Sequence, residues 1–125
     1  MSAKPKPSAS DFAPVFAALK KILAAHAAHL VVVADAPGDY KVNSTKVNPR
    51  NRQPFCVGMV CTGKNYVSFH LMPAYGMHHL ISPALKKRMQ GKACFNFTAV
   101  DDALFAELAD VTKRGLEGFK KLGLA

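Results

Sequence analysis

Apolar residues recur along this chain with two different spacings, and the change from one to the other divides it into segments. From Asp11 the spacing is that of an amphipathic helix of about 18 residues, capped by Ser10. Its inner stripe would consist of Phe12, Phe16, Leu19, Leu23 and Leu30, with Ile22 beside it. Helical spacing returns after Asp101, which caps a last predicted helix that runs to about Leu122.

Between these two helices the pattern is that of strands joined by tight turns. A β-branched run over residues 30–34 and a polar strand over 40–47 flank turn residues at 35–38. A short helix is predicted from the cap Ser82 to Gln90, ending at Gly91, and a short strand follows over 93–97.

The clearest hairpin joins residues 55–62 to residues 65–72. Gly63 and Lys64 suit a two-residue turn, which predicts an apolar core face that pairs Val60 with Val67, Gly58 with Phe69 and Cys56 with Leu71. The opposite face would be of mixed polarity and would pair Cys61 with Tyr66, Met59 with Ser68, Val57 with His70 and Phe55 with Met72. A slip of one residue would exchange the two faces.

These elements predict an α+β fold in a single domain over residues 11–125. Their order is α-β-β-β-β-α-β-α, with an antiparallel sheet of about five strands flanked by the N- and C-terminal helices. Residues 1–10 are interpreted as a disordered basic tail without a secretory signal. Since no apolar run approaches the roughly 20 residues of a membrane span, we expect a cytoplasmic protein that does not enter a membrane.

The composition changes this picture in two respects. The formal net charge is +9, from 17 Lys and Arg against 8 Asp and Glu, which favours anionic partners. The 3 cysteines have no framework spacing, so we interpret them as small buried hydrophobic residues, with Cys56 and Cys61 on opposite faces of one strand.

The sequence contains little that indicates a catalytic or metal-binding site. The chain has no Gly-rich phosphate loop, and His78 and His79 lack a carboxylate at ligand spacing. Ser68 and His70 are neighbours on one strand face, but no acid is placed to orient the histidine. A non-enzymatic role is therefore favoured.

The mixed face is the candidate site. Tyr66, Ser68 and His70 would hold a small or anionic ligand, with Asn96 beside them and a basic rim of Lys86, Arg88 and Lys92. Nucleic-acid binding through the basic surface is an alternative, and so is a homodimer interface on the same face, so the chain is expected to be a monomer or a homodimer. Phe95 and Phe97 flank Asn96, and we interpret them as core residues rather than as platforms for bases.

Four stretches carry a family resemblance: VSFHLMP over 67–73, ISPALKKRMQGKACFNF over 81–97, DFAPVFAALKKIL over 11–23 and DDALFAELADVTKRGLEGF over 101–119. In these stretches the chain resembles the YdhG-like family, a bacterial domain family. The resemblance implies a compact α+β domain with a helix-flanked antiparallel sheet. It also implies frataxin-like iron delivery as an alternative function, with iron as the cargo. The only acidic cluster that could serve iron consists of Asp101, Asp102, Glu107 and Asp110.

Overall fold

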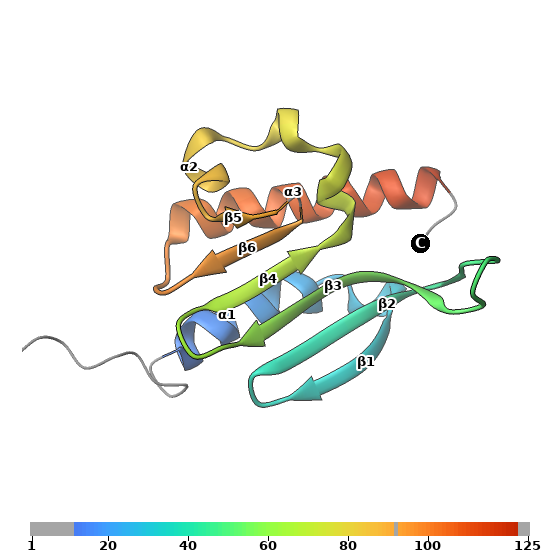
Figure 1. Cartoon of the computed structure of the whole chain (residues 1–125), viewed down its shortest axis with the longest axis horizontal. Coiled ribbons are helices and arrows are strands. Elements are labelled where there is room, and N and C mark those ends of the chain that lie inside the picture. Colours follow the sequence, from blue (N-terminus) through green and yellow to red (C-terminus); the bar gives the residue numbers. More distant parts are fainter. Residues whose placement is uncertain (1–11, 92, 123–125) are drawn as a thin grey trace, which may run out of the picture.

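A six-stranded antiparallel sheet forms the centre of the structure, and its strands follow the order β1-β2-β3-β4-β6-β5 (Figure 1). This computed structural model describes residues 12–91 and 93–122. The predicted tail, the Ser10 cap and Lys92 lie outside the described residues. The strands are β1 (Val31–Ala36), β2 (Asp39–Val47), β3 (Pro54–Thr62), β4 (Val67–Leu71), β5 (Met89–Gln90) and β6 (Cys94–Phe97). The helices are α1 (Ala13–Ala24), α2 (Pro83–Lys86) and α3 (Asp102–Lys121), with short 3-10 segments η1 (Ala27–His29), η2 (Met72–Gly76) and η3 (His78–Leu80).

The two long helices lie on the same face of the sheet. In Figure 1, α1 and α3 both run behind the strands, and each contacts the other. Among the described residues no helix covers the opposite face. This arrangement confirms the predicted α+β fold with an antiparallel sheet and flanking N- and C-terminal helices, and it leaves one face of the sheet open to solvent.

The first helix is shorter than its pattern predicted. It covers 12 residues, and its end continues as η1 instead of a further helical turn. Val15, Leu19 and Leu23 are its buried residues, while Phe16 and Ile22 are only partly buried. None of the helices in the described part of the chain is long and apolar enough to cross a membrane.

The hairpin between β3 and β4 forms, but its register differs from the prediction. Val60 pairs with Phe69 and Thr62 pairs with Val67, so the loop holds four residues, 63–66, rather than two. The register moves by two positions, which preserves the alternation of faces. Gly58 therefore stays on the core face, where it leaves room for Leu23 of α1 and not for the ring of Phe69: an added Cβ would lie 3.0 Å from Leu23 Cδ2.

The predicted placement of Cys56 and Cys61 on opposite faces is wrong, because β3 contains a β-bulge. Val42 pairs with Gly58, whereas Asn43 pairs with Cys56, so Val57 is the extra residue. Val57 is fully buried, although the simple alternation placed it on the mixed face. The bulge carries Cys56 to the face opposite the core, and Cys56 and Cys61 share that face instead of pointing to opposite sides.

The predicted short basic helix is replaced by one helical turn and an additional strand. Ser82 caps α2 as predicted, since its Oγ accepts a hydrogen bond from Leu85 N at 3.2 Å. The helix ends at Lys86, and Met89 and Gln90 pair with β6 as β5. Gly91, with φ +78, turns the chain from β5 into β6 and does not end a helix. The sheet consequently has six strands where about five were predicted.

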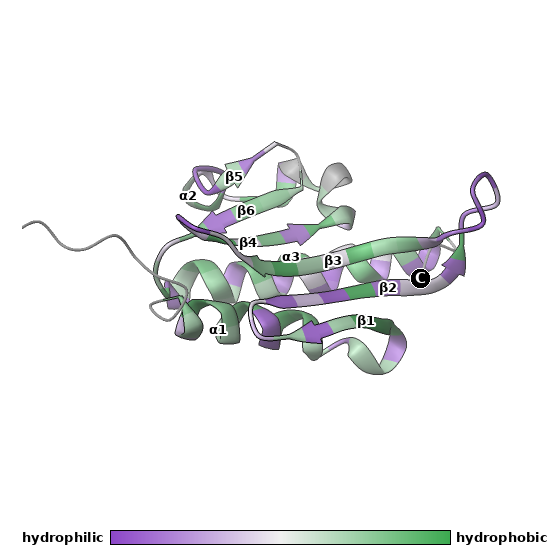
Figure 2. Ribbon diagram, turned by 60° about the horizontal axis from the view of Figure 1, so that its bottom comes forward, coloured by the Kyte–Doolittle hydropathy of each residue, from purple (hydrophilic) through white to green (hydrophobic). Residues whose placement is uncertain are grey.

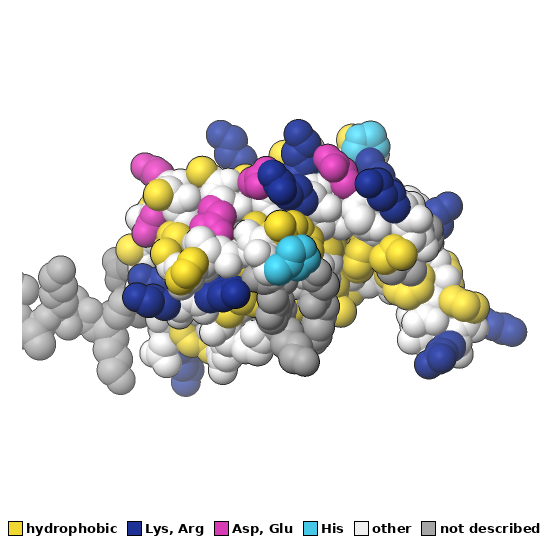
Figure 3. Space-filling model, turned by 90° about the horizontal axis from the view of Figure 1, so that it is seen from above, with side chains coloured by type: hydrophobic (Ala, Val, Ile, Leu, Met, Phe, Trp, Pro, Cys, Tyr) yellow, Lys and Arg dark blue, Asp and Glu magenta, His cyan; other side chains and the backbone are white. Residues whose placement is uncertain are grey.

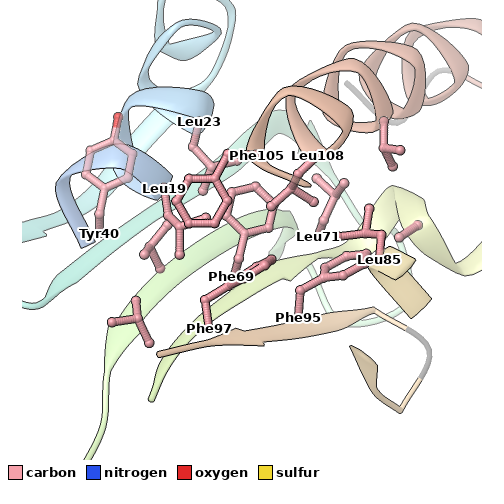
Figure 4. Close-up of a cluster of buried hydrophobic side chains, with 14 of the residues drawn as sticks. Leu19, Leu23, Tyr40, Phe69, Leu71, Leu85, Phe95, Phe97, Phe105 and Leu108 are labelled. Atoms are coloured by element: carbon pink, nitrogen blue, oxygen red, sulfur yellow. The ribbon is translucent and has the colours of Figure 1, made fainter. Parts of the chain in front are cut away.

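Aromatic residues of the central strands join the sheet to the C-terminal helix. Figure 4 shows Phe69, Phe95 and Phe97 side by side on the sheet. Phe105 and Leu108 of α3 pack against them. The rings of Phe97 and Phe105 meet edge to face with centroids 4.8 Å apart. Asp101 caps α3 as predicted, because its carboxylate accepts from Leu104 N. Phe95 and Phe97 are confirmed as core residues, at 0% and 2% exposure.

Candidate functional site

The two faces of the sheet differ in their side chains. The face that packs against α1 and α3 is aliphatic and aromatic, whereas the opposite face carries sulfur-containing and polar side chains. We call it the uncovered face, and on β3, β4, β5 and β6 it consists of Cys56, Met59, Cys61, Ser68, His70, Gln90, Cys94 and Asn96. All of these except Gln90 are half-buried. In Figure 2 hydrophilic segments of β4, β5 and β6 alternate with hydrophobic ones, as a sheet with one buried face requires.

Three of the predicted site residues meet in one hydrogen-bond network. Ser68 Oγ donates to Asn96 Oδ1 at 2.9 Å, and Asn96 Nδ2 donates to Gln90 Oε1 at 2.9 Å. The hydroxyl of Tyr66, which lies just before β4, reaches the same Gln90 oxygen at 3.5 Å. The structure thus brings together Tyr66, Ser68 and Asn96, although Tyr66 stands in the loop and not opposite Cys61.

Gln90 is a central member of this network that the sequence reasoning missed. It was predicted as the last residue of a short helix, whereas it lies in β5 and pairs with Cys94. The neighbouring Gly91 and the alternation of residues 93–97 contained a hairpin signal. A two-residue strand is too short for periodicity to reveal it.

His70 adjoins the network but makes a separate contact. It pairs with Met59 on one side and Cys94 on the other, and its Nε2 lies 3.0 Å from Sδ of Met72. Burial lowers the pKa of His70 below the ordinary value of an imidazole. At neutral pH the ring is therefore uncharged and can exchange one donor or one acceptor with a ligand.

The three cysteines are free thiols on this face, and none belongs to the core as predicted. Cys61 Sγ lies 3.6 Å from Asp39 Oδ1, and Cys94 Sγ lies 3.6 Å from Asn96 Oδ1. Burial, above all, raises the pKa of each of the three thiols. Because the thiolate is the nucleophilic form, this environment does not activate a cysteine for catalysis.

The basic residues predicted as a rim are exposed. Lys86 ends α2 and Arg88 follows it, and the carbonyl oxygen of Arg88 accepts a hydrogen bond from Asn96 N at 2.8 Å. The backbone of Arg88 is thereby fixed to the residue at the centre of the network. The third predicted cation of the rim, Lys92, lies outside the described residues.

Charge is unevenly distributed along the chain. The segment from residue 40 to residue 100 contains no Asp or Glu and nine basic residues: Lys41, Lys46, Arg50, Arg52, Lys64, Lys86, Lys87, Arg88 and Lys92. This segment supplies β3 to β6 in full and nearly all of β2. Helix α3, in contrast, carries acidic and basic residues together, and the side of the molecule in Figure 3 shows both signs interspersed.

Three of the four acids that an iron site would use are engaged elsewhere. Asp101 caps α3, Asp110 pairs with Arg114 at 3.0 Å, and Glu107 accepts from both N and Oγ of Ser82. Within residues 12–91 and 93–122, no group of three or more His, Cys, Asp or Glu residues has the geometry to hold a metal ion.

Comparison with known proteins finds no match: no family model, no curated protein and no solved structure is similar to the chain.

Proposed function

We propose that this protein is a non-enzymatic binding module that holds a small anionic ligand on the uncovered face. The observation that carries the proposal is the coincidence of two features in one segment. The network of Ser68, Gln90 and Asn96 lies in the segment of residues 40–100, which contains nine basic residues and no acidic one. We propose in addition that the chain is a member of the YdhG-like family, on the strength of the stretches quoted above and the helix-flanked antiparallel sheet.

The network has the chemistry to orient an anion. Amide and hydroxyl groups donate hydrogen bonds without carrying a charge of their own, so they fix a ligand that nearby cations attract. Arg88, whose side chain is exposed, is bonded through its backbone to the strand that holds Asn96, and the exposed Lys86 lies two residues earlier in the chain. An Arg guanidinium matches two oxygens of a phosphate or carboxylate at once.

A small anion fits this face better than a nucleic acid. Sheets that bind single strands present aromatic rings on which bases stack. Here Phe69, Phe95 and Phe97 all lie in the core, and the contact of Tyr66 with the network is made by its hydroxyl group. Hydrogen bonding and charge remain as the means of recognition.

The test is a titration with inorganic pyrophosphate, followed by the side-chain amide signals of Asn96 and Gln90 in NMR spectra. We expect these signals to shift. Asn96→Ala should weaken binding about tenfold, since it removes an oriented group worth roughly 1.4 kcal/mol or more. The double variant Lys86→Gln/Arg88→Gln should weaken it as much.

The matched control removes the same charge from the other side of the molecule. Lys113→Gln/Lys120→Gln changes two exposed residues of α3 and should leave the affinity within about twofold. Equal losses in the two double variants would show that only net charge matters and would refute the site. Tighter binding of an RNA homopolymer, with affinity falling steeply as salt rises, would favour the nucleic-acid alternative. A dimer in native mass spectra that Asn96→Arg dissociates would favour the subunit interface.

A further inference from the structure

A second candidate site lies between the 3-10 segments and the C-terminal half of α3. It is a cavity of about 330 Å³. Its described lining consists of Met72, Pro73, Met77, Leu80, Arg114, Gly115, Gly118, Phe119 and Leu122. Met72 of this lining contacts His70 of the uncovered face, but the network of Ser68, Gln90 and Asn96 contributes no residue to the cavity. Variants of Asn96 and Gly118 therefore test the two sites separately.

The walls of this cavity are apolar and its size suits a small ligand. Two methionines, two leucines, a phenylalanine and a proline supply its side-chain surface. Ligand pockets begin at about 300 Å³, and an apolar cavity of about 150 Å³ in another protein already binds benzene. Methionine side chains are flexible, which lets such a wall adapt to its occupant.

Two glycines of α3 line the cavity, and they differ in the space around them. An added Cβ at Gly115 would lie 2.6 Å from Pro73 Cβ, so close packing of η2 on the helix requires this glycine. At Gly118 a Cβ would meet nothing within 4 Å. A glycine inside a helix costs about 1 kcal/mol relative to alanine, and packing does not require it here. Its effect is to keep the cavity open.

Arg114 is the one charged residue in the described lining. Its Nε makes an ion pair with Asp110 Oδ2 at 3.0 Å, and both side chains are more than half exposed. A pair of this kind is weak in water. The two Nη groups of the guanidinium extend beyond Nε and have the fork geometry that a carboxylate accepts. Figure 3 shows hydrophobic side chains reaching the surface between Lys and Arg side chains on this side of the molecule.

We propose that this cavity binds a small apolar carboxylic acid, with its hydrocarbon part against Met72, Met77 and Phe119 and its carboxylate on Arg114. The apolar walls select the hydrocarbon and the single cation selects the acid over the corresponding alcohol. The excess of positive charge on the protein also favours an anionic occupant over a cationic one.

The experiment compares octanoate with octanol by isothermal titration calorimetry on the full chain. Octanoate should bind about tenfold more tightly than octanol. Arg114→Gln should abolish that preference by weakening octanoate alone. Asp110→Asn should retain or increase it, because this change releases the guanidinium from its partner. Equal affinity for the acid and the alcohol in the unmodified protein would overturn the choice of an acid.

A second pair of variants tests the place of binding. Gly118→Leu should fill the cavity and reduce octanoate affinity at least tenfold, while the helix gains propensity and the fold is retained. Ala106→Leu adds the same side chain at an exposed position of α3 outside the cavity and should have no effect. Octanoate binding that survives Gly118→Leu, or that Asn96→Ala weakens equally, would exclude this cavity as the site.

Discussion

The two glycines of α3 allow a sharp test of the packing between this helix and η2. Gly115→Ala and Gly118→Ala make the same chemical change three residues apart in one helix. In each case the new methyl group improves helix propensity by about 1 kcal/mol. The two positions differ only in what that methyl group meets.

At Gly118 the methyl group meets nothing within 4 Å, so the free energy of unfolding should rise by about 0.5–1 kcal/mol. At Gly115 it would lie 2.6 Å from Pro73 Cβ and 3.1 Å from Met77 Sδ. The methionine can rotate away, but the proline ring is tied to the backbone and cannot. Overpacking of this kind costs about 1–3 kcal/mol. After the gain in propensity, Gly115→Ala should destabilise the protein by up to about 2 kcal/mol.

Urea denaturation followed by circular dichroism measures both variants against the unmodified chain. The two midpoints should move in opposite directions with unchanged slopes, because neither change alters the surface exposed on unfolding. In thermal melts each kcal/mol should shift the midpoint by about 4 °C in a domain of this size. If Gly115→Ala stabilises the protein as much as Gly118→Ala, the contact of Pro73 with α3 is not as close as the structure has it.

Three further outcomes follow from the same structure. Glu107→Ala should lower the free energy of unfolding by about 2 kcal/mol in urea melts, because N and Oγ of Ser82 lose a charged acceptor at 2.8 and 2.6 Å. Burial lowers the folded-state pKa of His26 and His70, so the unfolded chain binds protons first on acidification. Stability should therefore be full above about pH 6.5, fall as the pH drops towards the folded pKa values, and fall less when both histidines are replaced by Gln. Phe69→Ala should cost about 3–5 kcal/mol, since the ring is fully buried, whereas a loss below 1 kcal/mol would contradict that burial.

The hairpin shows what the sequence can and cannot predict about this sheet. Alternation determines which residues share a face, and Val60, Val67 and Phe69 were placed in the core correctly. The register depends on how many residues form the turn, and Gly63 fits a two-residue turn and a longer loop equally well. The bulge at Val57 had no signal in the pattern, because Val57 and Gly58 are both compatible with either face.

The residues of the candidate site were likewise predicted only in part. Ser68 and Asn96 were grouped correctly because each lies on a strand whose inner face was evident from neighbouring Phe residues. Gln90 was missed because helix propensity and basic charge favoured extending α2, whereas pairing with β6 decided its conformation. The apolar cavity was not predictable, since its walls come from segments that only the tertiary structure brings together.

The distribution of charge predicts that the two proposed sites respond differently to salt. Two acids outside residues 40–100 are each paired with a cation: Asp35 of β1 with Lys20 at 2.6 Å, and Asp110 of α3 with Arg114 at 3.0 Å. The nine cations of residues 40–100 have no acid within their own segment, so this segment carries a positive net charge. Anions should thus be drawn first to the uncovered face, where hydrogen bonds from Asn96 select them, and salt should weaken this binding. At Arg114 the local charge is balanced by Asp110, so the apolar walls of the cavity must supply most of the affinity there. Salt should accordingly weaken pyrophosphate binding far more than octanoate binding, and equal salt sensitivity would mean that both ligands occupy the same basic surface.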